Sequence, residues 1–93
     1  MLQELVLSQN LFTGTISTGI GKLIRLEKMM LDRNRLLGVI PTELGAIKKL
    51  KHLSLKDNRI GGFVPSEIGN LKALETLELN HNELEGEVPR ELG

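Results

Sequence analysis

The apolar residues of this chain follow a pattern that recurs every 24 residues from one end of the sequence to the other. Each copy opens with a leucine, at Leu2, Leu26, Leu50 and Leu74. The copies cover residues 2–25, 26–49, 50–73 and 74–93, and they align without an insertion or a deletion. A fixed period of this length is typical of a solenoid in which each repeat packs on its neighbours. We therefore predict a single array of four repeats over residues 1–93, without capping segments.

Positions four and six of each repeat predict a short β-strand. They hold Leu5 and Leu7, Met29 and Leu31, Leu53 and Leu55, and Leu77 and Leu79. This alternation has the period of two that is typical of a half-buried strand. Stacked copies would place the strands side by side in a parallel sheet, about 4.8 Å apart, with the residues between the leucines facing outward.

Position nine of every repeat is asparagine: Asn10, Asn34, Asn58 and Asn82. We expect the chain to leave the strand and turn at this point. Buried backbone groups in a turn need hydrogen-bond partners, and an asparagine amide both donates and accepts. We therefore predict a column of asparagines that satisfies these groups layer by layer. The alternative is that each asparagine is only a surface turn former.

Glycine and proline mark the second half of each repeat. Glycine occupies position thirteen, at Gly14, Gly38, Gly62 and Gly86, and position twenty, at Gly21, Gly45, Gly69 and Gly93. Both positions suit a positive φ angle or a close approach of two backbones. Proline stands at position sixteen in three copies, and Ser17 replaces it in the first, where the flank is expected to be looser. Because proline fixes φ and donates no hydrogen bond, we expect an extended flank with a short second strand, then a 3₁₀ or single-turn helix.

The consensus LxxLxLxxNxLxGxIPxxLGxLxx resembles the plant-specific class of leucine-rich repeat, and the resemblance covers the whole chain. The G-x-I-P element separates this class from other leucine-rich repeats. The resemblance implies an α/β repeat fold, a right-handed solenoid with a concave parallel sheet, 3₁₀ or helical turns on the convex side and little true α-helix. It also implies a non-enzymatic module that binds a protein or peptide in signalling or defence. Such a module would be part of the ectodomain of a receptor-like kinase or receptor-like protein.

The chain also departs from that family. It has no cysteine for paired capping segments, no asparagine in an N-x-[ST] context and no kinase signature. Several apolar side chains near the two ends would face water: Leu2, Leu5, Leu7, Leu77, Leu79, Leu84 and Val88. Terminal repeats normally carry a polar outer face. We therefore expect a fragment or a truncated gene product, with a chain that associates end to end as the alternative.

Composition argues against several classes of partner. The 12 basic and 12 acidic residues give a formal net charge of zero, which argues against nucleic acid. The absence of cysteine excludes disulfides and thiolate metal sites. No stretch approaches the roughly 18 apolar residues of a membrane span, so we predict no direct membrane contact by this segment. No cofactor is indicated, and nothing in the sequence assigns a compartment.

The candidate binding surface is the concave face, formed by the variable residues around the strand leucines. These residues are Glu4, Val6 and Ser8; Lys28, Met30, Asp32 and Arg33; His52, Ser54, Lys56 and Asp57; and Thr76, Glu78, Asn80 and His81. Opposite charges would pair laterally in Glu27–Lys51–Glu75, Glu4–Lys28, Asp32–Lys56 and Arg33–Asp57. The face has no Trp or Tyr, which often anchor interfaces, so we expect weak binding. The alternative is a structural spacer whose repeats contact no ligand.

The two histidines, His52 and His81, raise the question of a metal site. They occupy positions three and eight of neighbouring repeats, up to five residues of strand apart, or roughly 16 Å. Two ligands of one ion lie within about 4 Å of each other, given bonds of ~2.1 Å. We therefore predict no metal site. No nucleophile motif or phosphate-binding loop is present, so we predict no enzyme activity.

Overall fold

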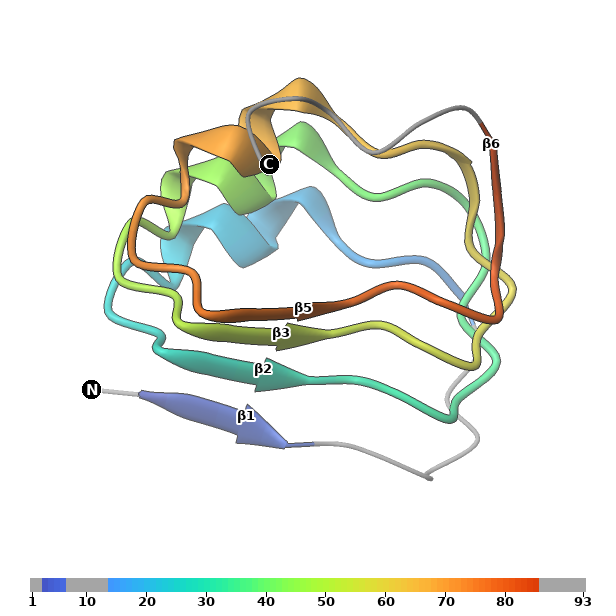
Figure 1. Cartoon of the computed structure of the whole chain (residues 1–93), viewed down its shortest axis with the longest axis horizontal. Coiled ribbons are helices and arrows are strands. Elements are labelled where there is room, and N and C mark those ends of the chain that lie inside the picture. Colours follow the sequence, from blue (N-terminus) through green and yellow to red (C-terminus); the bar gives the residue numbers. More distant parts are fainter. Residues whose placement is uncertain (1–2, 7–13, 86–93) are drawn as a thin grey trace.

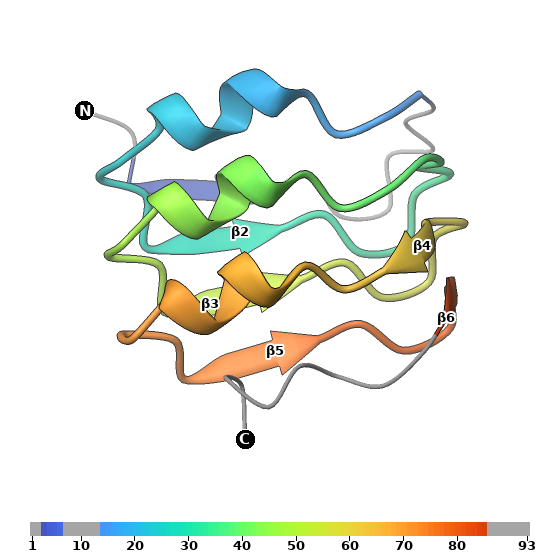
Figure 2. The same ribbon diagram turned by 90° about the horizontal axis from the view of Figure 1, so that it is seen from above.

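The computed structural model of this chain describes residues 3–6 and 14–85. Within that part of the chain, successive repeats stack so that strands line one side and short helices line the opposite side (Figure 1). The same two layers are seen from above in Figure 2. Predictions for Leu2, Leu7, Ser8, Asn10, Gly86, Val88 and Gly93 fall outside the described residues.

Four strands form one parallel sheet in the order β1-β2-β3-β5. They are β1 (Glu4–Val6), β2 (Lys28–Met30), β3 (His52–Ser54) and β5 (Thr76–Glu78). Their register joins residues that are 24 apart in the sequence, such as Leu53 with Leu77. Hydrogen bonds between layers continue beyond the strands, as from the Arg33 N–H to the Lys56 carbonyl oxygen at 3.0 Å. The parallel solenoid predicted from the alternation of leucines is confirmed.

A second, smaller set of strand pairings lies on the flank that follows each asparagine. Strands β4 (Gly61–Phe63) and β6 (Glu83–Glu85) pair in parallel. Isolated parallel bridges join Thr15 to Leu37 and Val39 to Gly61. The short second strand predicted for the flank is therefore present.

The two columns of glycines meet different needs. At position thirteen, φ is positive: +89° at Gly14, +78° at Gly38 and +72° at Gly62. At position twenty, the need is space. A Cβ atom on Gly45 would lie 2.6 Å from the Glu67 carbonyl oxygen, closer than any side-chain carbon tolerates. Glycine at position twenty therefore lets successive helices stack at backbone distance.

Three short 3₁₀ helices follow the flanks: η1 (Thr18–Lys22), η2 (Thr42–Ala46) and η3 (Ser66–Asn70). Pro41 precedes η2 with a φ of −71°. Ser17 takes the same place before η1 with a φ of −68°, and its Oγ accepts a 3.1 Å hydrogen bond from the Gly19 N–H. Serine thus reproduces the proline conformation.

The described residues contain no α-helix, in agreement with the predicted fold class. Their three helices have five residues each, and none in this part of the chain is long and apolar enough to span a bilayer. The convex side is thus built from single 3₁₀ turns, as short proline-led segments favour.

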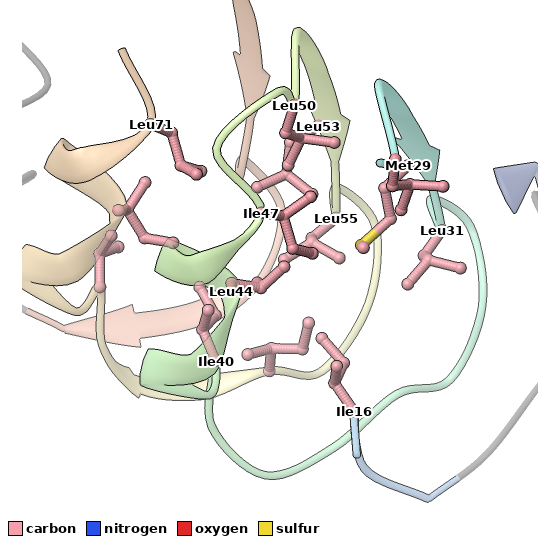
Figure 3. Packing of buried hydrophobic residues seen from close by; sticks show 14 of the residues in the cluster. Ile16, Met29, Leu31, Ile40, Leu44, Ile47, Leu50, Leu53, Leu55 and Leu71 are labelled. Atoms are coloured by element: carbon pink, nitrogen blue, oxygen red, sulfur yellow. The ribbon is translucent and has the colours of Figure 1, made fainter. Parts of the chain in front are cut away.

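The hydrophobic core lies between the sheet and the helices, and its most deeply buried side chains belong to the two inner repeats (Figure 3). Side chains with no exposed surface include Leu26, Met29, Leu44, Ile47, Leu50 and Leu55. The expectation that apolar side chains near the two ends face water holds only in part. Leu5, Leu77, Leu79 and Leu84 are partly buried because each packs on the inner core on one side. End-to-end association through these layers stays a prediction.

Asparagine side chains join the third and fourth repeats to the repeat before each of them. The Asn58 Oδ1 accepts a 3.1 Å hydrogen bond from the Leu36 N–H of the preceding repeat. Its Nδ2 donates to the carbonyl oxygens of Leu31 and Leu55, both at 3.0 Å. Asn82 repeats this geometry one layer further on, with its Nδ2 2.8 Å from the Leu55 oxygen. Each of these two amides therefore satisfies backbone groups in two layers at once.

Candidate functional site

We call the outward side of the four-stranded sheet, with positions seven and eight that follow each strand, the sheet face. The predicted residues that are exposed on it are Glu4, Val6, Arg33, Thr76, Glu78, Asn80 and His81. Those that are half-buried are Lys28, Met30, His52, Lys56 and Asp57. Asp32 and Ser54 are buried. Ser8 lies outside the described residues.

Ser54 is not available to a ligand, contrary to its inclusion in the predicted binding surface. The residue is 1% exposed, and its hydroxyl has no hydrogen-bond partner in the described structure. Ser54 is paired in register with Met30 on one side and Glu78 on the other. Both neighbours have longer side chains, so the short serine lies below the surface that they form. Asp32, at 9% exposed, also offers a ligand little surface, against its place in the prediction.

Arg33, Asp57 and His81 occupy position eight of successive repeats and form a row across the sheet face. The Asp57 Oδ2 lies 3.9 Å from the Arg33 Nε, and the Asp57 Oδ1 lies 2.7 Å from the His81 Nδ1. The contact with His81 becomes an ion pair when the imidazole is protonated. The sequence predicts the first of these contacts but not the second. One carboxylate therefore links three layers.

The backbone at position eight has a conformation that the sequence pattern did not reveal. Arg33, Asp57 and His81 have φ angles of 59°, 58° and 60°, although none of them is glycine. This left-handed conformation costs roughly 1–2 kcal/mol in such residues. Interlayer hydrogen bonds offset that cost, such as the one of 3.1 Å from the Asp57 N–H to the backbone carbonyl oxygen of Asn80. Asp and His are enriched among residues with a left-handed backbone, which is the only indication of this conformation that the sequence offers at position eight. Arg33 does not belong to these residue types.

Two more lateral contacts join the third and fourth repeats. The Lys56 Nζ lies 3.8 Å from the Glu78 Oε2. The His52 Nδ1 and the Thr76 Oγ1 share a hydrogen bond of 2.8 Å. Polar groups on this half of the sheet face are therefore largely engaged with one another.

At the edge where the strands begin, the predicted contact between Glu27 and Lys51 forms, with 3.7 Å between Oε1 and Nζ. Both side chains remain well exposed, so the pair contributes at most about 1 kcal/mol. Among the described residues, neither Glu4 and Lys28 nor Lys51 and Glu75 form the ion pair that the sequence predicts. The pair Asp32–Lys56 stays a prediction.

Apolar surface gathers on the half of the sheet face that β1 and β2 form. Val6 is 54% exposed and Met30 is half-buried, and the two are paired in register. Glu4 and Lys28 are paired in the same two strands. We call the part beside β1 and β2, where Val6 and Met30 lie next to the charged Glu4 and Lys28, the apolar half, and the laterally bonded part beside β3 and β5 the polar half.

The histidines serve separate contacts. His52 bonds Thr76, whereas His81 contacts Asp57. Among the residues that the structure describes, no three side chains of His, Asp or Glu are grouped so that they could hold a metal ion. The two histidines therefore belong to separate lateral contacts of the sheet face.

Two family models cover this sequence. Residues 24–84 match the model described as "Leucine rich repeat", and residues 1–23 match a second one, "Leucine Rich Repeat". The chain therefore belongs to the leucine-rich repeat family. A comparison with curated proteins finds no match.

Among solved structures, the chain resembles ectodomains of plant receptor kinases. It is 42% identical to the receptor of the PEPR1–AtPEP1 structure, with a TM-score of 0.94 over 97% of this chain and 13% of that chain. For the GASSHO1/SCHENGEN3 ectodomain from Arabidopsis thaliana, in complex with CASPARIAN STRIP INTEGRITY FACTOR 2, the identity is 39% and the TM-score 0.93. That match covers 97% of this chain and 11% of that one.

A third match is to the BIR3–SERK2 complex from Arabidopsis thaliana, at 38% identity and a TM-score of 0.93, over 97% of this chain and 48% of that chain. The present chain therefore spans from 11% to 48% of the length of these three. The matched regions are ectodomain repeats, which are non-enzymatic modules, and they agree with the predicted plant-type class.

Proposed function

We propose that the sheet face of this chain binds a protein or peptide, and that the chain is part of a receptor-like recognition protein in signalling or defence. The observation that carries the proposal is the rigid row of variable side chains that four strands hold in register. The structures of PEPR1–AtPEP1 and of GASSHO1/SCHENGEN3 with its bound factor support it, because their repeats have the same fold.

The apolar half of the sheet face is the expected source of affinity. Covering Val6 and Met30 would remove apolar surface from water, which stabilises a complex by up to roughly 2 kcal/mol for each side chain. The polar half is expected to set specificity more than affinity, because Lys56 and Asp57 already have charged partners. A ligand would therefore lie across the strands and contact both halves.

The alternative function is that of a structural spacer that extends a longer array. The lateral contacts favour it, because Asp57 contacts Arg33 on one side and His81 on the other, and Lys56 contacts Glu78. Groups that satisfy one another within the face leave fewer free donors and acceptors for a ligand. One experiment separates the two functions.

The test begins with peptides selected from a random-peptide display library on the whole chain. Their affinity is then measured for the double variant Lys56→Glu with Glu78→Lys. This exchange keeps the net charge and the lateral pair but inverts the charge pattern that a ligand on the sheet face meets. We expect the selected peptides to bind the variant at least about tenfold more weakly.

The matched control is the exchange Glu27→Lys with Lys51→Glu. It inverts a pair of nearly the same separation, 3.7 Å, beyond the start of the strands. We expect this control to change affinity by less than about twofold. Unchanged binding to the Lys56 and Glu78 exchange would overturn the sheet-face proposal, and failure to select any peptide would favour the spacer.

A further inference from the structure

The four-residue turns that begin at the last residue of each 3₁₀ helix carry an unbalanced positive charge. They are residues 22–25, 46–49 and 70–73. They contain no acidic residue and five basic ones: Lys22, Arg25, Lys48, Lys49 and Lys72. We call these five side chains the basic edge. Its segments are the turns at the left of Figure 1, where the strands begin. Because the whole chain has a formal net charge of zero, the excess of positive charge in these turns is balanced by acidic residues elsewhere in the chain.

All residues of the basic edge are exposed. Within the described part of the chain, none of them forms an ion pair with a carboxylate. The sheet face differs, because Arg33 and Lys56 each have a carboxylate partner there. A group of cations without counter-ions produces a positive local potential that attracts an anionic partner.

The basic edge is also regular. Lys48 and Lys72 share position 23 of neighbouring repeats, and Arg25 and Lys49 share position 24. Since repeats stack at about 4.8 Å, these side chains form rows along the axis of the solenoid. The backbone of each segment forms hydrogen bonds, such as the one of 3.0 Å from the Lys72 N–H to the backbone carbonyl oxygen of Asn70. The basic side chains therefore project from a hydrogen-bonded backbone at regular intervals.

Acidic side chains border the basic edge on both sides. Glu43 and Glu67 lie in the first turns of η2 and η3, whereas Glu27 and Glu75 directly precede β2 and β5. Glu43, Glu67 and Glu75 are exposed, and Glu27 is half-buried and paired with Lys51. A broad anionic surface, such as a membrane or a nucleic acid duplex, would meet these carboxylates as well as the lysines. A single extended chain that follows the rows would avoid them.

The residue types of the basic edge further restrict the class of partner that it could bind. Its residues include no aromatic side chain on which a nucleotide base could stack. Four of its five cations are lysines, which act as hydrated point charges and do not require the planar geometry that arginine recognises. We propose that the basic edge binds an extended acidic segment of a protein partner, on a surface separate from the sheet face.

The experiment measures binding of a labelled oligoglutamate peptide to the whole chain by fluorescence anisotropy. The test variant is Lys48→Glu with Lys72→Glu, which reverses one row of the basic edge. We expect it to weaken binding by about tenfold or more, because two attractions become repulsions. Binding to the wild-type chain should also fall steeply as NaCl is raised from about 50 to about 200 mM.

The matched control is Arg35→Glu with Arg59→Glu. These arginines share position ten of the same two repeats, are exposed, and lie at the opposite edge, beyond the ends of the strands. The control changes the net charge by the same amount, and we expect it to alter binding by less than about twofold. Equal weakening by both variants would overturn the proposal, because binding would then follow net charge alone.

Two further outcomes would also overturn it. One is no binding of oligoglutamate at low salt, which would make the basic edge a solvated surface only. The other is tighter binding of polygalacturonate, duplex DNA or phosphatidylserine vesicles, lost in the Lys48 and Lys72 variant, which would assign the edge to another class of partner. The exchange at Lys56 and Glu78 should leave oligoglutamate binding unchanged. The proposal for the basic edge and the proposal for the sheet face can therefore be tested and rejected independently.

Discussion

The inner and outer repeats carry similar apolar residues and the same asparagine at equivalent positions, yet only the inner repeats have a layer on each side. Leu53 is 1% exposed, whereas Leu77, its partner in register in the fourth repeat, is half-buried. Asn58 is 8% exposed, whereas Asn82 is half-buried. Burial therefore depends on a layer at each side and not on the residue type. The stability of such an array resides in contacts between layers as much as within them.

The largest expected effect is at the asparagine of an inner repeat. Asn58→Asp preserves the shape and the acceptor oxygen but removes the NH₂ group that donates to the Leu31 and Leu55 oxygens. The variant would bury a carboxylate against carbonyl oxygens without a cation to offset it. We expect the free energy of unfolding at neutral pH to fall by about 4 kcal/mol, measured by urea denaturation.

The matched variant in the outer repeat is Asn82→Asp. Because Asn82 is half-buried, water can solvate the new carboxylate, and we expect a loss of about 2 kcal/mol. Asn58→Ala gives a second reference, since it removes the amide without burying a charge and should cost less than Asn58→Asp. Equal losses at Asn58 and Asn82 would show that enclosure between layers does not set the cost.

The leucines of the sheet provide the next effect in size. Leu53→Ala would leave a cavity between two layers, and we expect a loss of about 3 kcal/mol in the free energy of unfolding. Leu77→Ala removes the same atoms where water already reaches the side chain, so we expect about 1.5 kcal/mol. Hydrogen exchange of the β3 and β5 amides, followed for both variants, would show whether each effect is local. A loss at Leu77 as large as that at Leu53 would remove the distinction between inner and outer repeats.

The fold could be predicted because residues close in the sequence encode each of its elements. The alternation around Leu53 predicts β3, and the glycine and proline that follow predict the flank and the 3₁₀ helix. The 24-residue period then places like elements side by side. What the pattern did not reveal is the left-handed backbone at Asp57 and its counterparts. Contacts with neighbouring layers hold that conformation, and the residue type at the position varies.

The candidate site could be predicted only in outline. The period of two correctly indicates which positions leave the core, but the exposure of each residue depends on neighbours 24 residues away. Ser54 is buried because Met30 and Glu78 beside it are long. Likewise, the contact of His81 with Asp57 joins two repeats and needs their relative positions. Side-chain length across layers is therefore the information that a repeat pattern lacks.

The smallest expected effect concerns the serine that replaces proline in the first repeat. Ser17 has a φ of −68°, compared with −71° at Pro41, and it also accepts a hydrogen bond from the Gly19 N–H. Ser17→Pro would restrict the unfolded chain, which stabilises by about 0.4–1 kcal/mol. It would also remove an exposed cap that contributes roughly 0.5 kcal/mol. We therefore expect a net change in the free energy of unfolding within about 0.5 kcal/mol of zero.

Pro41→Ser is the reciprocal variant in an inner repeat. The new serine can form the same cap but loses the restriction of the unfolded chain and, because Pro41 is buried whereas Ser17 is exposed, some buried apolar surface. We therefore expect a loss of about 1 kcal/mol. Urea denaturation of both variants tests whether the flanks are equivalent. If Ser17→Pro instead stabilised the chain by more than about 1 kcal/mol, the first flank would be looser than its φ angle indicates, as the sequence alone predicts. The difference between outer and inner repeats would then extend from the core to the flank.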